Sequence, residues 1–358
     1  MKSLFRYIFA AAVLLGALSC QRNPLPAAPE LPEGPPMLFS AGGSGMHIEG
    51  KAGAELQDPT SFQTVGNSFA VYGTWTVSNG TSANVFTKQT VTLTHDSNDG
   101  LDKWLYSPLR YWQKSGKYQF RAVYPTTAAT TSSSNASSLI VTYSMSTEDY
   151  DLMVACSRER DMALNDTTIV DLEFRHACAA IRFLFRKGTQ ATADYHLKSF
   201  ELQYILSVGS LVFVSTDDTE PLDGQWWVAD DFRPSSIYSW SGNIQVPALY
   251  EDFPGSGTTW EEWHCVIPQR VYNRNSETEV PSVRFSSSIL EGSEYTDPAF
   301  TTIELPSTYM DGSESKPVYW EAGKMYTYYI QIQPGGAQIT VETTDWDSYK
   351  VAVEDMIF

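Results

Sequence analysis

Histidines are the first residues to examine for chemistry, because imidazole is a common metal ligand and general base. No two of them stand four apart on a predicted helix, which is the spacing that zinc hydrolases use. Only His176 and Cys178 lie near each other, and residues two apart share one face of a strand. Two ligands without a third favour a core histidine, so the sequence predicts no metal site and no cofactor. The full set is His47, His95, His176, His196 and His264.

Paired carboxylates could act as the acid and base of a glycoside hydrolase. The clearest clusters are Asp217 with Asp218 and Glu261 with Glu262. A chain with 42 Asp and Glu residues offers such clusters by chance, and their separation in space decides the chemistry. No Gly-x-Ser-x-Gly nucleophile motif precedes a predicted helix. We therefore expect a protein that is not an enzyme.

Tryptophan side chains could bind a ligand by stacking on sugar rings. The alternative is packing in the core, where the large apolar area of tryptophan is usually placed. Exposed, coplanar rings would favour the glycan interpretation, and buried rings would favour the core. The residues concerned are Trp226, Trp227, Trp240, Trp260 and Trp263.

The N-terminus reads as an export signal. Lys2 and Arg6 precede an apolar run over 7–18, and Leu18-Ser19-Cys20 follows. The run is too short to span a bilayer, which needs about 20 apolar residues. Its ending resembles the bacterial lipoprotein signal, which implies that residues 1–19 are removed and that Cys20 carries the acyl chains. The alternative is an ordinary secretory signal with a cysteine at its cleavage site.

Proline dominates residues 20–36, which we expect to form an extended spacer between the anchor and the folded part. Such a segment could also be a ligand for an aromatic groove in a partner. The six prolines are Pro24, Pro26, Pro29, Pro32, Pro35 and Pro36.

Composition limits the class of protein. The chain has 358 residues, and 24 Lys and Arg against 42 Asp and Glu give a net charge of −18, which disfavours nucleic acid as a partner. Only 18% of residues are charged and 42% are apolar, with 13% aromatic. Cys156, Cys178 and Cys265 form an odd set, so at most one disulfide can form within a chain, and we favour buried thiols.

Short alternating or apolar runs, broken by turn residues about every ten positions, predict an all-β sandwich or barrel. In 169–185 the alternation changes phase between His176 and Ala180, which predicts a bulge or short crossing. We expect a surface loop at 126–138, a linker with a helical turn at 148–166, and a domain boundary near 164. The expected strands are 68–75, 84–93, 116–124, 139–143, 169–185, 199–206, 211–214, 324–332 and 338–343, with a weaker one at 280–285 that Pro281 makes an edge strand or delays to Ser282.

The order of several loose motifs resembles the fimbrillin family, the type V pilins and related lipoproteins of Gram-negative gut and oral bacteria. A lipoprotein signal ends at Cys20, and a first strand follows at 37–41. The later motifs are FQTVGNSFAVYG (62–73), WLYSPLRYW (104–112), YQFRAVYP (118–125), YDLMVA (150–155), VDLEFRHACAAIRF (170–183) and WEAGKMY (320–326), ahead of a hairpin over 332–341 and Trp346.

The resemblance implies two tandem transthyretin-like Greek-key β-sandwich domains, at 37–163 and 164–358. It also implies a lipid-anchored outer-membrane protein that serves as a pilus subunit, anchor or tip adhesin. In pilin members a trypsin-like protease removes the first strand, and another subunit donates a strand to the open groove. The first strand here would contain Leu38 and Phe39. The alternative is a monomeric surface lipoprotein that binds glycans through exposed tryptophans.

The cleavage step depends on a basic residue after the first strand. No arginine occurs between Arg22 and Arg110, which leaves Lys51 as the basic residue near the expected loop. Either a protease cuts after Lys51, or this chain keeps its first strand and its lipid. The donor strand could come from 345–358, where Tyr349, Val351 and Val353 alternate. That segment could equally pair within its own domain.

Overall fold

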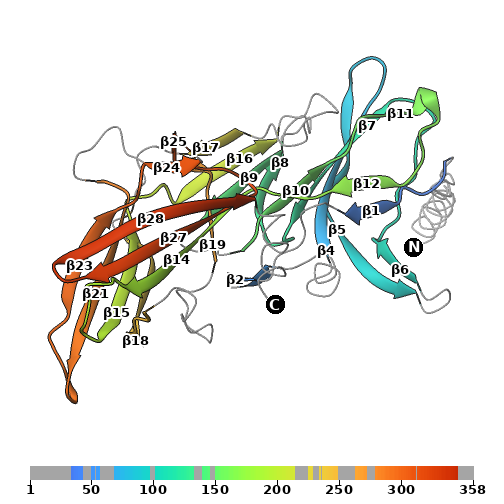
Figure 1. Ribbon diagram of the computed structural model, residues 1–358. Helices are drawn as coiled ribbons and strands as arrows, with labels where there is room; N and C mark the ends of the chain where they lie inside the picture. Colours follow the sequence, from blue (N-terminus) through green and yellow to red (C-terminus); the bar gives the residue numbers. More distant parts are fainter. Residues whose placement is uncertain are drawn as a thin grey trace, which may run out of the picture.

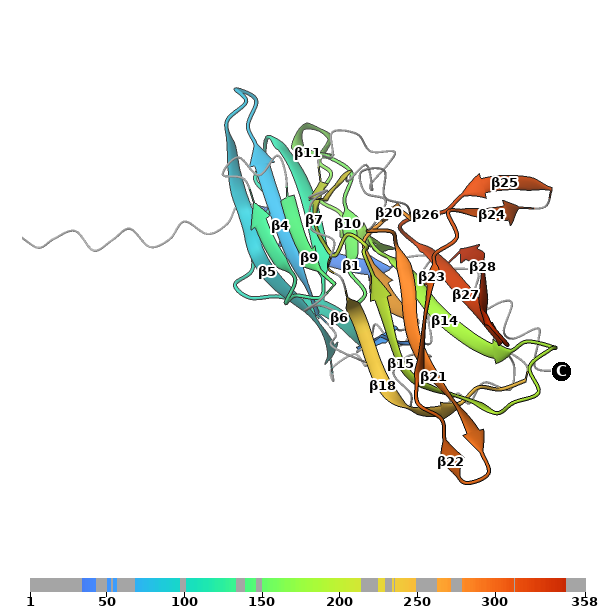
Figure 2. The ribbon, with the colours of Figure 1, turned by 90° about the vertical axis from the view of Figure 1, so that its left-hand side faces the viewer.

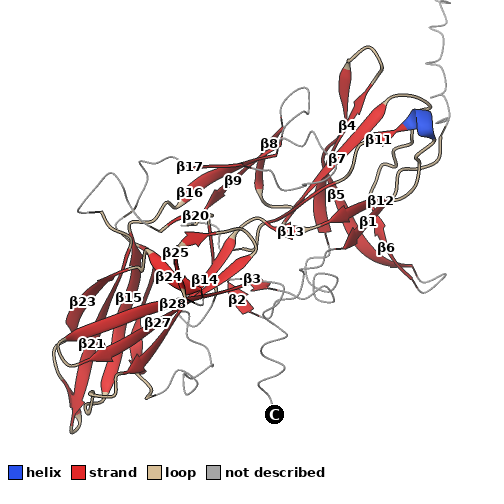
Figure 3. Cartoon of the chain, turned by 45° about the horizontal axis from the view of Figure 1, so that its top comes forward, coloured by secondary structure: helices blue, strands red, loops and turns tan. Residues whose placement is uncertain are grey.

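The computed structural model describes residues 34–42, 50–52, 54–56, 68–96, 101–132, 139–145, 150–213, 225–228, 234, 236–248, 263–271, 279–311 and 313–345. Within these ranges the regular structure is β, apart from the 3-10 turn η1 (Met162–Leu164) (Figure 3). The all-β prediction is confirmed. Within the described part of the chain, no helix has the length and apolar character needed to cross a bilayer.

One large antiparallel sheet forms the N-terminal part of the molecule (Figure 1). Its strand order is β13-β10-β7-β4-β5-β6, and β11 pairs with the first two residues of β7. The strands are β4 (Ser68–Thr76), β5 (Ser82–Asp96), β6 (Leu101–Leu105), β7 (Lys117–Tyr124), β10 (Met153–Cys156), β11 (Arg160–Asp161) and β13 (Arg175–His176).

A short parallel sheet covers the apolar face of this large sheet. It consists of β1 (Phe39–Gly42) and β12 (Val170–Glu173), with Phe39 opposite Val170 and Gly42 opposite Glu173. We call the cluster enclosed here the N-terminal core. Its members come from β1, β4, β5, β7, β10 and β12 and from neighbouring loops: Met37, Phe39, Phe69, Val71, Phe86, Val91, Tyr106, Trp112, Tyr118, Phe120, Ala122, Met153, Ala155, Met162, Val170, Leu172 and Phe174.

Two further sheets face each other in the C-terminal part and form a β-sandwich (Figures 1 and 2). Rings from both sheets meet between them, as between Phe185 and Phe285 at 5.3 Å. The first sheet runs β19 (His264–Val266), β14 (Ala179–Lys187), β27 (Lys324–Gln333) and β28 (Gly336–Asp345). The second runs β18 (Ile237–Gln245), β15 (Tyr195–Gln203), β21 (Ser282–Glu291) and β22 (Glu294–Tyr295), with β23 (Ala299–Glu304) also on β21.

A fifth sheet joins the two parts of the chain. In it β9 (Leu139–Ser144) pairs with β16 (Val208–Phe213), and β8 (Ala129–Ser132) and β17 (Gln225–Val228) lie at the edges. Smaller pairs are β2 (Gly50–Ala52) with β3 (Ala54–Leu56), β20 (Gln269–Arg270) with β26 (Tyr319–Trp320), and β24 (Thr308–Asp311) with β25 (Glu314–Pro317).

Strands that follow the predicted boundary at 164 pair and pack with strands that precede it. β12 lies after that position but pairs with β1, and Phe174 still belongs to the N-terminal core. The second core begins at Ala177 and includes residues of β9. The division into domains at 37–163 and 164–358 therefore stays a prediction, and any cut there would separate paired strands.

The predicted change of phase after His176 is confirmed. Val170, Leu172 and His176 are buried at even-numbered positions, whereas Ile181 and Phe183 are buried at odd-numbered positions. The chain crosses from the N-terminal core to the second core between β13 and β14. One alternative predicted for Pro281, that it delays the start of the strand to Ser282, is also confirmed, because β21 begins at Ser282.

Two expectations about irregular segments were wrong. The predicted loop at 126–138 contains the edge strand β8, whose Ala129 and Thr131 pair with β9. The predicted linker at 148–166 contains β10, which lies between β7 and β13. Met153, Val154 and Ala155 are all buried, so β10 shows no alternation of apolar and polar residues. The helical turn expected in the same stretch is η1.

Candidate functional site

The first strand inserts two large side chains into the N-terminal core. Met37 is 0% exposed and Phe39 is 5% exposed, whereas Leu38 between them is 39% exposed. This in-out-in pattern is that of an extended chain with one buried face. A strand is observed where the first strand was expected, but it begins at Phe39, so Met37 and Leu38 lie just before it.

Three aromatic rings surround Phe39. Its ring centroid lies 5.5 Å from that of Phe86, 5.6 Å from that of Tyr106 and 5.6 Å from that of Phe120, each in an edge-to-face arrangement. Such pairs contribute about 0.5–1.5 kcal/mol each beyond the burial of apolar area. The surface around Phe39 is therefore shaped for a planar ring.

Backbone hydrogen bonds fix the register of the same segment. The Met37 N–H donates to the Arg110 carbonyl at 2.8 Å, and the Val170 N–H donates to the Leu38 carbonyl at 2.8 Å. The Tyr106 hydroxyl donates to the Met37 carbonyl at 2.8 Å. Burial raises the pKa of the Tyr106 hydroxyl further above its ordinary value, so the group is protonated at neutral pH. We call the groups that hold this segment, Phe86, Tyr106, Arg110, Phe120 and Val170, the β1-binding surface.

The end of the proline-rich tether belongs to this contact as well. Pro36 forms an isolated antiparallel bridge with Tyr111, and the Trp112 N–H donates to the Pro35 carbonyl at 3.1 Å. At Gly34 a Cβ atom would lie 2.2 Å from the carbonyl oxygen of Trp112, so only glycine permits this approach. Sequence reasoning placed residues 34–36 in the free spacer and missed these contacts.

A buried arginine holds the segment 162–169, which leads from β11 into β12. We call this segment the β12 crossover. Arg160 is 4% exposed, and its guanidinium donates to Asp166 at 2.8 Å and to the Ile169 carbonyl at 2.8 Å. Partial burial acts to raise the pKa of the Asp166 carboxyl, but the hydrogen bond from Thr168 and the charges of Arg160 and Arg158 outweigh it and hold that pKa below its ordinary value. Sequence reasoning gave no signal for this arrangement.

The other residues proposed from the sequence are distributed as follows. Lys51 lies in β2 opposite Glu55 of β3, in a hairpin between β1 and β4. Cys20, the candidate lipidation site, and Tyr349, Val351 and Val353, the candidate donor residues, lie outside the described residues. The carboxylate candidates Asp217, Asp218, Glu261 and Glu262 also lie outside them.

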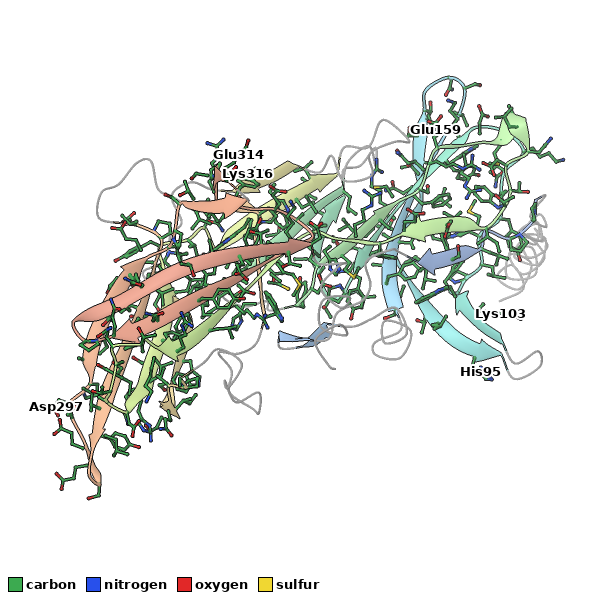
Figure 4. The ribbon with its side chains drawn as sticks, viewed as in Figure 1. His95, Lys103, Glu159, Asp297, Glu314 and Lys316 are labelled. Atoms are coloured by element: carbon green, nitrogen blue, oxygen red, sulfur yellow. The ribbon has the colours of Figure 1, made fainter. Side chains whose placement is uncertain are left out.

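The histidine and cysteine candidates occupy separate places. His176 is buried and its Nδ1 lies 2.9 Å from a carboxylate oxygen of Asp151, within hydrogen-bond distance. His95 lies near the end of the β5–β6 hairpin beside Lys103, on the outside of the molecule (Figure 4). The described residues contain no group of three or more His, Cys, Asp and Glu side chains that could hold a metal ion.

The three cysteines after Cys20 are present as thiols. Cys178 and Cys265 are fully buried, and Cys156 is half-buried. Burial raises the pKa of the Cys156 thiol to about 11, and the nearby Arg121 offsets only part of that effect. At neutral pH Cys156 is therefore protonated and a poor nucleophile.

The described tryptophans contribute to packing. Trp263 is 4% exposed, and Trp226 and Trp240 are half-buried against the second core. The Trp226 indole N–H donates to the Ala177 carbonyl at 3.0 Å. These three rings do not form an exposed platform, which favours the core interpretation; Trp260 lies outside the described residues.

The β1-binding surface has the chemistry of strand recognition. It offers a carbonyl, an amide N–H and a hydroxyl to the backbone of an extended segment, together with an aromatic site for one side chain. Backbone bonds carry affinity for any extended chain, and the side-chain sites select the sequence. The arrangement therefore binds a β-strand and selects a ring at one position.

Comparisons with known proteins give a family match and several structural neighbours. The profile of the family described as fimbrillin-like matches residues 58–346. A fimbrial protein from Bacteroides vulgatus is 16% identical, with 87% of this chain and 99% of that chain covered and a TM-score of 0.49. The tip fimbrial protein Mfa3 from Porphyromonas gingivalis is 11% identical, with 87% and 100% covered and a TM-score of 0.36.

No curated protein sequence matches the chain. The assignment rests on the family profile, which spans most of the sequence from before β4 to the end of β28. The chain therefore belongs to the fimbrillin-like family.

Proposed function

We propose that the protein is a subunit of a surface pilus that polymerises when its first strand is removed and a strand from another subunit takes its place. The observation that carries this proposal is the position of β1. It pairs with a single partner strand, β12, among the described residues, yet it fills the centre of the N-terminal core. Its loss would leave an aromatic surface that water solvates poorly.

The contacts of β1 support exchange rather than permanent attachment. Burying Met37 and Phe39 contributes about 1.5–3 kcal/mol each, which is enough to hold an intact precursor closed. The hydrogen bonds to Arg110 and Val170 involve backbone atoms of Met37 and Leu38, just before β1, and any extended segment in the same register could make them. A cleaved first strand could leave and an incoming strand could make the same bonds.

The proposal includes a lipid anchor on Cys20 and cleavage after Lys51. Acyl chains on Cys20 would hold the precursor at the outer membrane, since each buried methylene contributes about 0.8 kcal/mol. The hairpin β2–β3 that contains Lys51 pairs with no other strand within the described ranges. Cleavage there would separate β1 from the rest of the chain without cutting a strand of the main sheets.

The test is a Lys51→Gln substitution in the producing cell, with Lys316→Gln on the peripheral β25 as the matched control (Figure 4). The proposal predicts that Lys51→Gln leaves an uncleaved chain in the outer membrane and abolishes surface fibres seen by electron microscopy. Lys316→Gln should leave both unchanged. Normal fibres from the Lys51→Gln cells would refute cleavage at this position.

A further inference from the structure

Exposed aliphatic side chains lie side by side on the outward face of the segment that leads into β1. Leu38 is 39% exposed, Leu109 is 46% exposed and Ile169 is 53% exposed. Because Phe39 pairs with Val170 in a parallel register, the residues one position earlier, Leu38 and Ile169, are neighbours. Phe39 and Val170 are buried, so the two preceding side chains point outward.

Leu109 lies on the other side of Leu38. The bridge between Pro36 and Tyr111 is antiparallel, so two residues further along the same register reaches Leu38 on one segment and Leu109 on the other. Leu109, Leu38 and Ile169 therefore form a row across three adjacent segments. We call these three residues the aliphatic row.

The segments that carry the aliphatic row are almost free of charge. Across 35–38, 107–111 and 167–169, the one charged residue is Arg110, which is exposed and positive in a chain whose net charge is −18. The other residues of these segments are aliphatic, proline, serine, threonine or tyrosine, apart from the buried Met37. The surface around the row is therefore apolar with a single cation at its edge.

The outward face changes from aliphatic to acidic along β1 and β12. Ser40 lies opposite Asp171, and Gly42 lies opposite Glu173. The Ser40 hydroxyl donates to the Asp171 carboxylate at 2.8 Å. The apolar part of this face is therefore confined to the end near Gly34, where the proline-rich tether joins the fold.

From this arrangement we infer that the aliphatic row rests on the lipid of the outer membrane while the uncleaved chain is anchored there. The inference rests on the lipid anchor at Cys20 in the proposed function. The 14 residues from 20 to 33 can separate the anchor from Gly34 by at most about 50 Å, at about 3.5 Å per residue. Such a tether holds this end of the fold close to lipid at a high effective concentration, so a small apolar contact can form.

A lipid surface suits the chemistry of the aliphatic row. Leucine and isoleucine side chains enter the boundary between headgroups and acyl chains, and the Arg110 guanidinium beside them can bind a lipid phosphate. The acidic side chains of Asp171 and Glu173 begin beyond the row, where contact with lipid would be unfavourable. The contact therefore orients the molecule, and the acyl chains on Cys20 hold it.

Cleavage would change this contact, because Leu38 belongs to the segment that cleavage after Lys51 releases. The aliphatic row is complete only in the uncleaved chain. Loss of Leu38 separates Leu109 from Ile169 and removes the middle of the apolar surface. Docking on lipid is therefore a property of the precursor, and cleavage weakens it as the subunit leaves the membrane.

The experiment uses the full lipidated chain, purified from the producing cell and reconstituted in phosphatidylcholine vesicles. A fluorophore that responds to its environment is attached, in separate preparations, to Leu109→Cys, Ile169→Cys and Phe300→Cys. Phe300 is the matched control, because it is 62% exposed and lies on β23, at the end of the molecule far from β1 (Figure 1). The parent chain, taken through the same labelling, gives the background from its own thiols.

We expect nitroxides on the lipid acyl chains to quench the fluorophores at 109 and 169 at least about threefold more strongly than the one at 300, because only the row enters the lipid. Adding Leu38→Asp should reduce the quenching at 169 to the level found at 300. Adding Tyr295→Asp, an equally exposed position on β22, should leave the quenching at 169 unchanged.

Four outcomes would overturn the inference. Weak quenching at all three positions, in a chain whose mass shows the lipid on Cys20, would reject docking and leave the pilus proposal standing. Equally strong quenching at 300 would show that contact with lipid is not specific to the row. A blue shift at 169 without quenching would assign the row to another protein surface. A chain without acyl groups on Cys20 would reject the anchor in the proposed function, and the inference with it.

Discussion

At the scale of single residues, Phe39 links the sequence to the proposed exchange of strands. It is the residue of β1 whose ring contacts three other rings, and its neighbour Leu38 points to solvent. The contrast between these two adjacent residues defines which face of the first strand holds it in place. A change at each should therefore have a very different effect.

Replacing Phe39 by alanine should release β1 locally. Removal of a buried phenylalanine costs about 3–5 kcal/mol, so opening of this strand should become at least about 100-fold more frequent. The readout is hydrogen exchange of the Val170 N–H, which donates to the Leu38 carbonyl. Leu38→Ala is the matched control and should change this exchange rate by less than about tenfold. Equal protection in Phe39→Ala and the parent would contradict the account.

From the depressed pKa of Asp166 we can predict how acid affects the stability of the β12 crossover. Its folded-state pKa is depressed, so its stabilising contribution is present above the unfolded pKa of about 3.9 and is lost as pH falls through the lower, folded value. The free energy of unfolding should therefore fall below about pH 4, and less steeply in Asp166→Asn. Denaturant titrations at a series of pH values measure this. Identical pH dependence in the two proteins would show that the carboxylate does not contribute.

At the scale of elements, alternation predicted those strands that have one buried face. β14 and β21 were recognised in this way, including the change of phase before β14 and the start of β21 at Ser282. β10 was missed because all three of Met153, Val154 and Ala155 are buried, so its sequence has no period of two. β8 was missed because its alanine, two threonines and serine are equally typical of a loop. Pairing between distant segments, such as β1 with β12, leaves no local signal.

The shared strands predict how fragments behave. A fragment of residues 37–163 lacks β12 and β16, which are the partners of β1 and β9. It should therefore be digested rapidly by a broad-specificity protease under native conditions. A fragment of residues 34–176 regains β12, Phe174 and the contacts of Gly34, and it should resist digestion for longer. Equal lifetimes for the two fragments would contradict the role assigned to β12.

At the scale of the whole molecule, the sequence predicted the fold class and the fimbrillin-like family, and the profile match over 58–346 confirms the family. It also placed Phe39 in the first strand, because apolar residues of a strand can be recognised from the neighbouring sequence alone. It could not locate the ring set of Phe86, Tyr106 and Phe120, since these lie on three separate segments that only the folded chain brings together. The contacts that Arg160 makes in the β12 crossover could not be predicted for the same reason.

The central claim is that the first strand is removed before the protein assembles. The most direct test is the N-terminal sequence and intact mass of the protein recovered from surface fibres of the producing cell. The account predicts a chain that begins at Ala52, directly after Lys51, and carries no lipid. A chain in those fibres that begins at an acylated Cys20 would contradict it, because β1 would still occupy the surface that the donor strand needs.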